Sequence, residues 1–195
     1  GSMGTARSDH TATRLADGRV LVTGGFNTMP GVGLTAAEIY NPASGTFTGT
    51  GSLHGGRGEH TATRLLDGTV MVAGGYPTVP DPAVNTTELF DPGTGTFTTG
   101  AVMSVPRGSH TATLGAEGSV LIAGGYMVYP LGGATLSSAE RYLPASRTFV
   151  AAGTMAQARG RHAAARLDDG SVLGRRFGVR ASRPRFGAGS EVGAT

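Results

Sequence analysis

Four histidines recur at nearly even spacing and are the residues most able to do chemistry. His10, His60 and His110 lie 50 residues apart, and His162 follows 52 residues later. Imidazole is a common metal ligand, so four histidines that meet around one axis could form a metal site. A catalytic site, however, requires such a group only once, whereas a side chain present in every repeat is expected to have the same structural role in each repeat. We therefore expect these histidines to be structural, for example by closing a hydrogen bond between neighbouring repeats, with a metal-binding ring as the alternative.

A second recurring set combines opposite charges. Glutamates open a β-type segment in three repeats, and an arginine stands three residues before every histidine: Glu38, Glu88 and Glu140; Arg7, Arg57, Arg107 and Arg159. A buried carboxylate is costly without a partner. The arginine that follows His-Thr-Ala-Thr is replaced by Leu114 in the third repeat, although Glu140 persists there. The sequence therefore predicts an Arg–Glu pair, within or between repeats, that uses the arginine before the histidine.

These residues belong to a unit of about 50 residues that predicts four short strands. In the first copy, His-Thr-Ala-Thr-Arg-Leu at 10–15 predicts one strand, and Asp17-Gly18 indicates a hairpin turn into Val20-Leu21-Val22. Every second strand ends at a glycine pair, where we expect tight backbone packing: Gly24-Gly25, Gly74-Gly75 and Gly124-Gly125. A Glu-containing third strand and a fourth strand with one Phe complete the repeat.

Four antiparallel strands per repeat are typical of one blade of a β-propeller. The motif His-Thr-Ala-Thr-x-Leu-x-Asp-Gly-x-Val-Leu-Val-x-Gly-Gly resembles the kelch family, including bacterial kelch and galactose-oxidase central-domain repeats, over residues 1–173. Phe47, Phe97 and Phe149 stand where many kelch repeats carry Trp. The resemblance implies an all-β fold, and kelch propellers serve as partner-binding platforms, adaptor domains and occasional enzyme scaffolds.

We predict a partial propeller of about 3.5 blades, at residues 8–50, 58–100 and 108–152 with a partial blade at 160–173. After Leu173 the expected Val-Ala-Gly-Gly is replaced by Gly174-Arg175-Arg176. Residues 174–195 are thus predicted to be an Arg/Gly-rich, largely disordered tail, left by a frameshift or an artificial gene end, or alternatively by natural divergence. The ring would not close, so its open blade faces predict self-association, marginal stability or missing blades in a longer protein.

Composition excludes several classes of site. The chain has no Cys, so thiol nucleophiles, thiolate metal sites and disulfides are excluded. Residues 1–173 carry 11 Arg against 12 acidic residues, whereas residues 174–195 carry five Arg and only Glu191. The high pI therefore comes from the tail, and we expect no nucleic-acid partner. No apolar stretch is long enough for a membrane span. No signal peptide is recognisable at the N-terminus, so any export signal lies outside this chain; a secreted or cell-surface bacterial location is our expectation.

The loops between the second and third strands are the expected binding surface, because they differ in sequence around a shared proline and emerge beside the blade connections. The candidate contact residues in these loops are Asn27, Pro30, Pro80, Asp81, Tyr129 and Pro130. Phe26, Tyr76 and Tyr126 follow the glycine pairs and are expected in the core.

The predicted function is a non-catalytic binding or scaffolding module, without a cofactor, for a protein or glycan partner. The alternative is a fragment of a galactose-oxidase-like carbohydrate oxidase scaffold, because the His-x-x-x-x-Leu-x-Asp-Gly strand is similar to that family's. Its copper site would be missing, since the family's cofactor involves a Cys cross-linked to a Tyr and this chain has no Cys.

Overall fold

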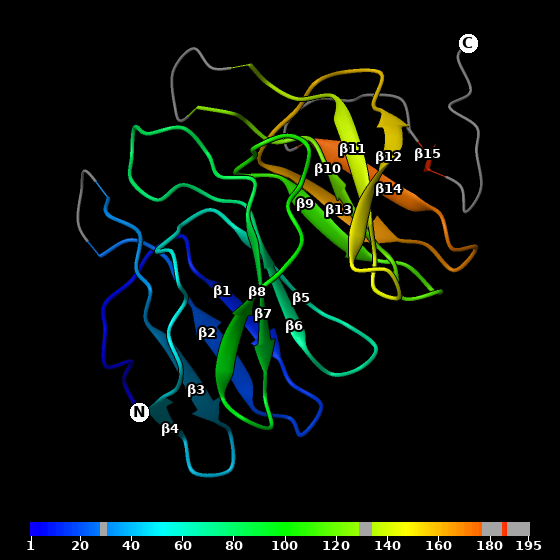
Figure 1. Ribbon diagram of the computed structural model, residues 1–195. Coiled ribbons are helices and arrows are strands. Elements are labelled where there is room, and N and C mark those ends of the chain that lie inside the picture. The colour runs from blue at the N-terminus through cyan, green and yellow to red at the C-terminus, as the bar shows by residue number, and fades with distance from the viewer. Residues whose placement is uncertain (28–30, 129–133, 177–184, 187–195) are drawn as a thin grey trace.

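A computed structural model describes residues 1–27, 31–128, 134–176 and 185–186. Every regular element in these ranges is a β-strand (Figure 1). Three successive sheets have four strands each, and consecutive strands along the chain are antiparallel neighbours. The predicted all-β class and the four-stranded repeat are therefore confirmed.

The strands of the three complete blades occupy equivalent positions in each repeat. The first blade contains β1 (Thr11–Arg14), β2 (Val20–Thr23), β3 (Ala37–Asn41) and β4 (Thr46–Gly49). The second contains β5 (Thr61–Arg64), β6 (Val70–Ala73), β7 (Thr87–Asp91) and β8 (Thr96–Thr99). The third contains β9 (Thr111–Leu114), β10 (Val120–Ala123), β11 (Ser138–Leu143) and β12 (Thr148–Thr154).

The fourth sheet has three strands in the order β13 (His162–Arg166), β14 (Val172–Arg176) and β15 (Arg185–Phe186). The predicted end of the repeat array, after Leu173, falls inside β14. The strand continues because its backbone pairs with β13 as far as His162 opposite Arg176, and this pairing does not require the missing glycine pair. Residues 185–186 of the predicted tail form β15. The tail's other residues, 177–184 and 187–195, lie outside the described ranges.

The blades are joined through their first strands. β1, β5, β9 and β13 are neighbours in that order, so the four sheets follow one another as blades of an incomplete propeller (Figure 1). The apolar second strands are covered on both faces, as their continuous apolar runs predict, and all four residues of β6 are buried. One core cluster joins Leu21 and Ile39 of the first blade to Val70 and Phe90 of the second. The core thus lies between blades, which makes each blade depend on its neighbour.

Candidate functional site

The recurring histidines join each blade to the one before it. His60 Nε2 lies 2.9 Å from the hydroxyl of Thr11, a residue of the preceding blade. The same hydrogen bond joins His110 to Thr61 at 2.9 Å and His162 to Thr111 at 3.1 Å. These three histidines are buried, whereas His10, in the first of the described blades, is only partly buried. The hydrogen bond between neighbouring repeats that the spacing suggested is present at all three junctions.

The glycine pairs make room for these histidines. A Cβ atom on Gly24 would lie 2.5 Å from the carbonyl oxygen of Arg57 and 2.7 Å from the ring of His60, both in the next blade. Gly24 also has a φ of +63°, in the left-handed region that residues with a Cβ rarely adopt. Gly74 and Gly124 stand in the same relation to His110 and His162. The tight packing predicted at the glycine pairs is therefore a contact between blades.

Burial keeps the junction histidines neutral. It lowers the pKa of His60 and of His110 to about 3 and the pKa of His162 to about 4, and the nearby arginine guanidinium lowers each further. The described residues contain no group of three or more His, Asp or Glu side chains arranged to hold a metal ion. In these three histidines the Nε2 atom that a metal could use instead shares a hydrogen bond with a threonine.

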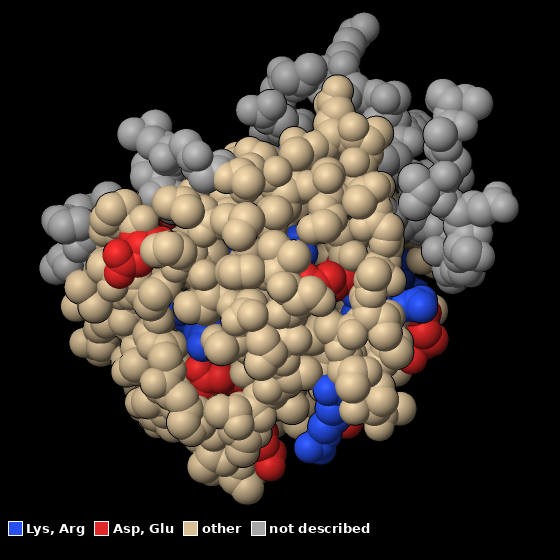
Figure 2. All heavy atoms as spheres, turned by 45° about the horizontal axis from the view of Figure 1, so that its top comes forward, with Lys and Arg blue, Asp and Glu red and all other residues tan. Residues whose placement is uncertain are grey.

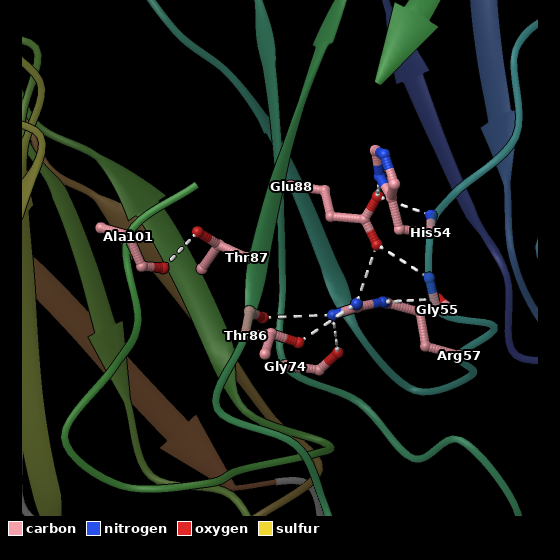
Figure 3. Close-up of polar contacts among 8 residues, drawn as sticks. All are labelled: His54, Gly55, Arg57, Gly74, Thr86, Thr87, Glu88 and Ala101. Atoms are coloured by element: carbon pink, nitrogen blue, oxygen red, sulfur yellow. Dashed lines mark hydrogen bonds and ion pairs between the residues drawn. The ribbon is translucent and has the colours of Figure 1, made fainter. Parts of the chain in front are cut away.

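In each of the three complete blades, the arginine before the histidine pairs with the third-strand glutamate of its own blade, and Figure 3 shows the pair of Arg57 and Glu88. Arg57 Nη2 lies 2.9 Å from Glu88 Oε1, and its Nη1 donates to the carbonyls of Gly74 and Thr86 at 3.1 Å each. Glu88 also accepts from the backbone N–H of His54 at 2.8 Å. The equivalent pairs are Arg7–Glu38 at 2.7 Å and Arg107–Glu140 at 2.9 Å. The pair is thus internal to a blade, where it ties the incoming connection to β2 and β3 or their counterparts.

A hollow of about 400 Å³ lies at the centre of the four blades, at the N-terminal ends of the first strands. We call it the channel mouth. It is lined by the four repeat histidines and by the residue that precedes each of them: Asp9, His10, Glu59, His60, Ser109, His110, Arg161 and His162. The residues before the histidines share one backbone conformation, with φ between 49° and 52°. Their backbones also form one hydrogen-bonded series, since the N–H groups of Glu59, Ser109 and Arg161 each donate to the carbonyl of the counterpart in the previous blade, at 2.8 to 3.0 Å.

The side chains on this series differ in every blade. Glu59 accepts hydrogen bonds from the Ser109 hydroxyl and from Arg161 Nη2, at 2.5 Å for the latter. Arg161 therefore reaches from the fourth blade to the second, which shows how closely the blades converge here. Asp9 is exposed. Its two carboxylates and one guanidinium give the mouth a formal charge of −1, histidines not counted.

Sequence reasoning did not single out these four residues. The signal was present, however, as variation inside an otherwise repeated segment: Arg-Ser-Asp-His, Arg-Gly-Glu-His, Arg-Gly-Ser-His and Arg-Gly-Arg-His. The position before the histidine is the one that changes its chemistry from blade to blade, whereas the arginine and the histidine do not change.

The loops between second and third strands lie at the same end of the blades as the channel mouth. The segments that enter the first strands pair with the starts of these loops, as Ser8 with Phe26 and Gly58 with Tyr76. Neighbouring loops also bond to one another, for example through Gly33 N–H and Pro77 O at 2.7 Å. Of the predicted contact residues, Asn27, Pro80 and Asp81 are exposed, and Pro30, Tyr129 and Pro130 lie outside the described residues.

The aromatic residues after the glycine pairs pack beneath the loops, as expected. Phe26 and Tyr76 are buried, and Tyr126 is partly buried. A Cβ atom on Gly58 would overlap the Phe26 ring, and Gly108 stands in the same relation to Tyr76. The Tyr76 hydroxyl donates to the Tyr126 carbonyl at 3.1 Å. These rings support the loops and leave the loops' polar residues at the surface.

Charged side chains are few on the face that Figure 2 turns to the viewer. Arginines and acidic residues lie there in small separate groups, several of them side by side, among neutral residues. The described residues contain no helix that is both long and apolar enough to cross a lipid bilayer. No model of a known protein family matches the sequence, and no curated protein matches it.

Proposed function

We propose that this chain is a kelch-type, non-catalytic binding or scaffolding module that recognises a protein or glycan at the channel mouth and its surrounding loops. The observation that supports the proposal is that the channel mouth combines a repeated backbone conformation with side chains that differ from blade to blade. One backbone conformation, with φ near 50°, is repeated four times and presents Asp9, Glu59, Ser109 and Arg161. A fixed framework with changing side chains is the usual arrangement of a recognition surface.

The residues that repeat in every blade are occupied by internal contacts. The junction histidines bond to threonines, and three of the arginines bond to glutamates. General acid–base catalysis requires a group whose pKa lies near the working pH, and burial moves these histidines well below it. This arrangement supports a structural role for the repeated residues and a binding role for the variable ones.

The chemistry of the mouth suits a ligand rich in hydroxyl or amide groups. Carboxylates accept hydrogen bonds and a guanidinium donates them, so the set can contact sugar hydroxyls or the backbone and polar side chains of a protein loop. Asp9 and Arg161 are both exposed, and 55% of the Arg161 side chain is accessible, so these two residues are the best placed to make first contact.

An array of immobilised glycans, followed by titration of any ligand found, tests the proposal for the glycan class. Arg161→Gln should weaken binding by roughly tenfold or more, because a charge-assisted hydrogen bond is lost. Arg19→Gln is the matched control, since Arg19 is a partly exposed arginine paired with Asp17 on the β1–β2 turn, at the other end of the blade. Equal losses in the two variants would place the ligand elsewhere.

Copper titration separates this proposal from the oxidase-scaffold alternative. We expect no stoichiometric Cu²⁺ binding by the purified chain. Binding of one Cu²⁺ per chain that is lost in His110→Gln but kept in His54→Gln would instead favour a metal centre in the histidine ring. His54 is the suitable control because it lies outside the ring and its side chain is 58% exposed.

A further inference from the structure

The two carboxylates of the channel mouth differ in whether they have a partner. Asp9 is exposed, and within the described residues no arginine or histidine lies within ion-pair distance of its carboxylate. Its backbone carbonyl is occupied, because it accepts a hydrogen bond from the Glu59 N–H at 3.0 Å. Since Asp9 lines the hollow, both of its carboxylate oxygens are available to a ligand there.

Glu59 shows what such a carboxylate binds in this place. It accepts hydrogen bonds from the Ser109 hydroxyl and from Arg161 Nη2, at 2.5 Å for the latter. The Glu59 side chain is 9% exposed, whereas that of Arg161 is 55% exposed. The mouth therefore accommodates a guanidinium against a carboxylate while much of the arginine side chain stays at the surface. Asp9 occupies the same backbone position in the neighbouring blade, with the same φ of 51°, but no arginine of the described residues reaches it.

The uncompensated charge of the mouth lies on Asp9. Arg161 neutralises Glu59, and the three junction histidines add no positive charge at neutral pH, because burial lowers their pKa to about 3 or 4. A hollow lined by one excess charge and walled by protein concentrates the electric field, which favours a ligand of the opposite sign. A positively charged group should therefore bind here in preference to a neutral one of the same shape.

We propose that the channel mouth takes an arginine side chain of a partner protein, whose guanidinium pairs with Asp9. This inference rests on the proposed function and names the chemistry of its partner. A guanidinium presents two parallel N–H groups that match the two oxygens of a carboxylate, whereas an ammonium is a point charge without that fork. The hollow, at about 400 Å³, lies within the size range of ligand pockets. Binding of this kind repeats between two proteins the contact that Arg161 makes with Glu59 within one chain.

Two small probes that differ only in charge test the proposal directly. N-acetylarginine amide and N-acetylcitrulline amide have the same length and shape, but citrulline carries a neutral urea group in place of the guanidinium. Each is titrated into the full chain while the backbone amide signals are followed by NMR. The arginine probe should shift the signals of Asp9, His10, Glu59 and His60, which line the mouth. It should bind roughly five- to tenfold more tightly than the citrulline probe, because it alone forms a charge-assisted hydrogen bond.

Asp9→Asn removes the charge that the proposal invokes. Asparagine tolerates a φ of 51° better than most residues, so the backbone of the mouth should be kept. In this variant the two probes should bind with equal affinity. Asp81→Asn is the matched control, since Asp81 is an exposed carboxylate on the loop between β6 and β7 and does not line the hollow. It should keep the full preference for the arginine probe.

Salt provides a second measurement that needs no variant. Raising the ionic strength from about 50 mM to about 500 mM should weaken binding of the arginine probe and leave the citrulline probe nearly unchanged. Equal affinity of the two probes for the unaltered chain, an undiminished preference in Asp9→Asn, or no shift at the mouth with about 50 mM of the arginine probe would overturn the proposal.

The outcome for the proposed function is distinguishable from the outcome for this inference. A glycan or protein whose binding is weakened by Arg161→Gln but unaffected by Asp9→Asn would refute the pairing with Asp9 and leave the channel mouth as the recognition site. Equal losses in Arg161→Gln and Arg19→Gln would instead reject the mouth as the site, whichever probe binds.

Discussion

The three complete blades and the fourth blade differ in which of two recurring contacts they keep. The complete blades contain an Arg–Glu pair, and the second and third are also joined to the preceding blade by a His–Thr bond. The fourth blade keeps the His–Thr bond, through His162 and Thr111, but no glutamate of the described residues pairs with Arg159. The bond between blades needs only two first strands, whereas the ion pair needs a third strand. A blade can therefore attach to its neighbour through its first strand even when its own third strand is incomplete.

The fourth blade also lacks the residues with which the other blades contact the histidine of the next blade. Thr11, Thr61 and Thr111 each receive the histidine of the next blade, but Ala163 stands at this position in the fourth repeat. By strand register, Arg176 stands where the other repeats have the first glycine of the pair. A fifth blade could not attach by the contacts that join the first four. Self-association through open blade faces stays a prediction.

Lowering the pH should destabilise the junctions between blades, and this is the largest effect that we expect. The junction histidines have pKa values of about 3 to 4 in the folded chain, against an ordinary value of 6.5, so the unfolded chain takes up their protons first as the pH falls. Stability from this source is present above about pH 6.5 and is lost progressively as the pH falls below it, because the unfolded chain then binds one more proton than the folded chain for each junction histidine.

Urea unfolding at a series of pH values measures this loss. The slope of unfolding free energy against pH gives the number of protons that the chain takes up on unfolding. Below pH 6.5, His110→Gln should reduce this number by about one. A slope that stays unchanged in this variant would mean that His110 is not held neutral by its junction.

Removal of one ion-pair charge should have the next largest effect. Glu88→Gln leaves the buried Arg57 without a counterion, and we expect a loss of about 3–5 kcal/mol in unfolding free energy. Arg159→Gln should cost less, because no carboxylate of the described residues loses its partner. Glu117→Gln, at an exposed turn, is the control. A loss below about 0.5 kcal/mol for Glu88→Gln would mean that the pair contributes no more than a surface pair.

Two glycines of the first blade with nearly the same φ allow the contribution of packing between blades to be measured separately from backbone strain. Gly24 has a φ of +63° and lies against the second blade, whereas Gly45 has a φ of +68° and a Cβ there would meet nothing within 4 Å. Both Ala variants bear the cost of the left-handed conformation, about 1–2 kcal/mol. Gly24→Ala should lose roughly 1–3 kcal/mol more from overpacking against backbone atoms. Equal melting temperatures for the two variants would refute the tight junction.

The hydroxyl at the blade junction should have the smallest effect of the set. Thr61→Val keeps the side-chain shape but removes the hydrogen bond to His110, and we expect a loss of about 1 kcal/mol. Thr98→Val, on the exposed strand β8, should stay within about 0.5 kcal/mol of the parent chain. If the two variants are equally stable, the His–Thr bond adds nothing beyond packing.

Repetition made much of the fold predictable. The strands, the Asp-Gly turns, the glycine pairs and the partnership of Arg57 with Glu88 all follow from residues that recur in step, because equivalent positions in a repeat share one environment. The same logic failed at the fourth repeat. There β14 continues past Leu173 and β15 returns to pair with it, and backbone hydrogen bonds form both pairings without the side-chain motif.

The amino-acid sequence by itself determined the blade: its four strands, its turns and the side chains that hold it together. These features depend on contacts within a single repeat or between adjacent repeats, and each feature recurs three or four times in the sequence. Tertiary structure alone decided where different repeats converge. Arg161 meets Glu59 across 102 positions of sequence, and Asp9 and Ser109 join them only because the blades turn about a common axis. Such a meeting depends on the sum of the rotations between blades, which no single repeat encodes.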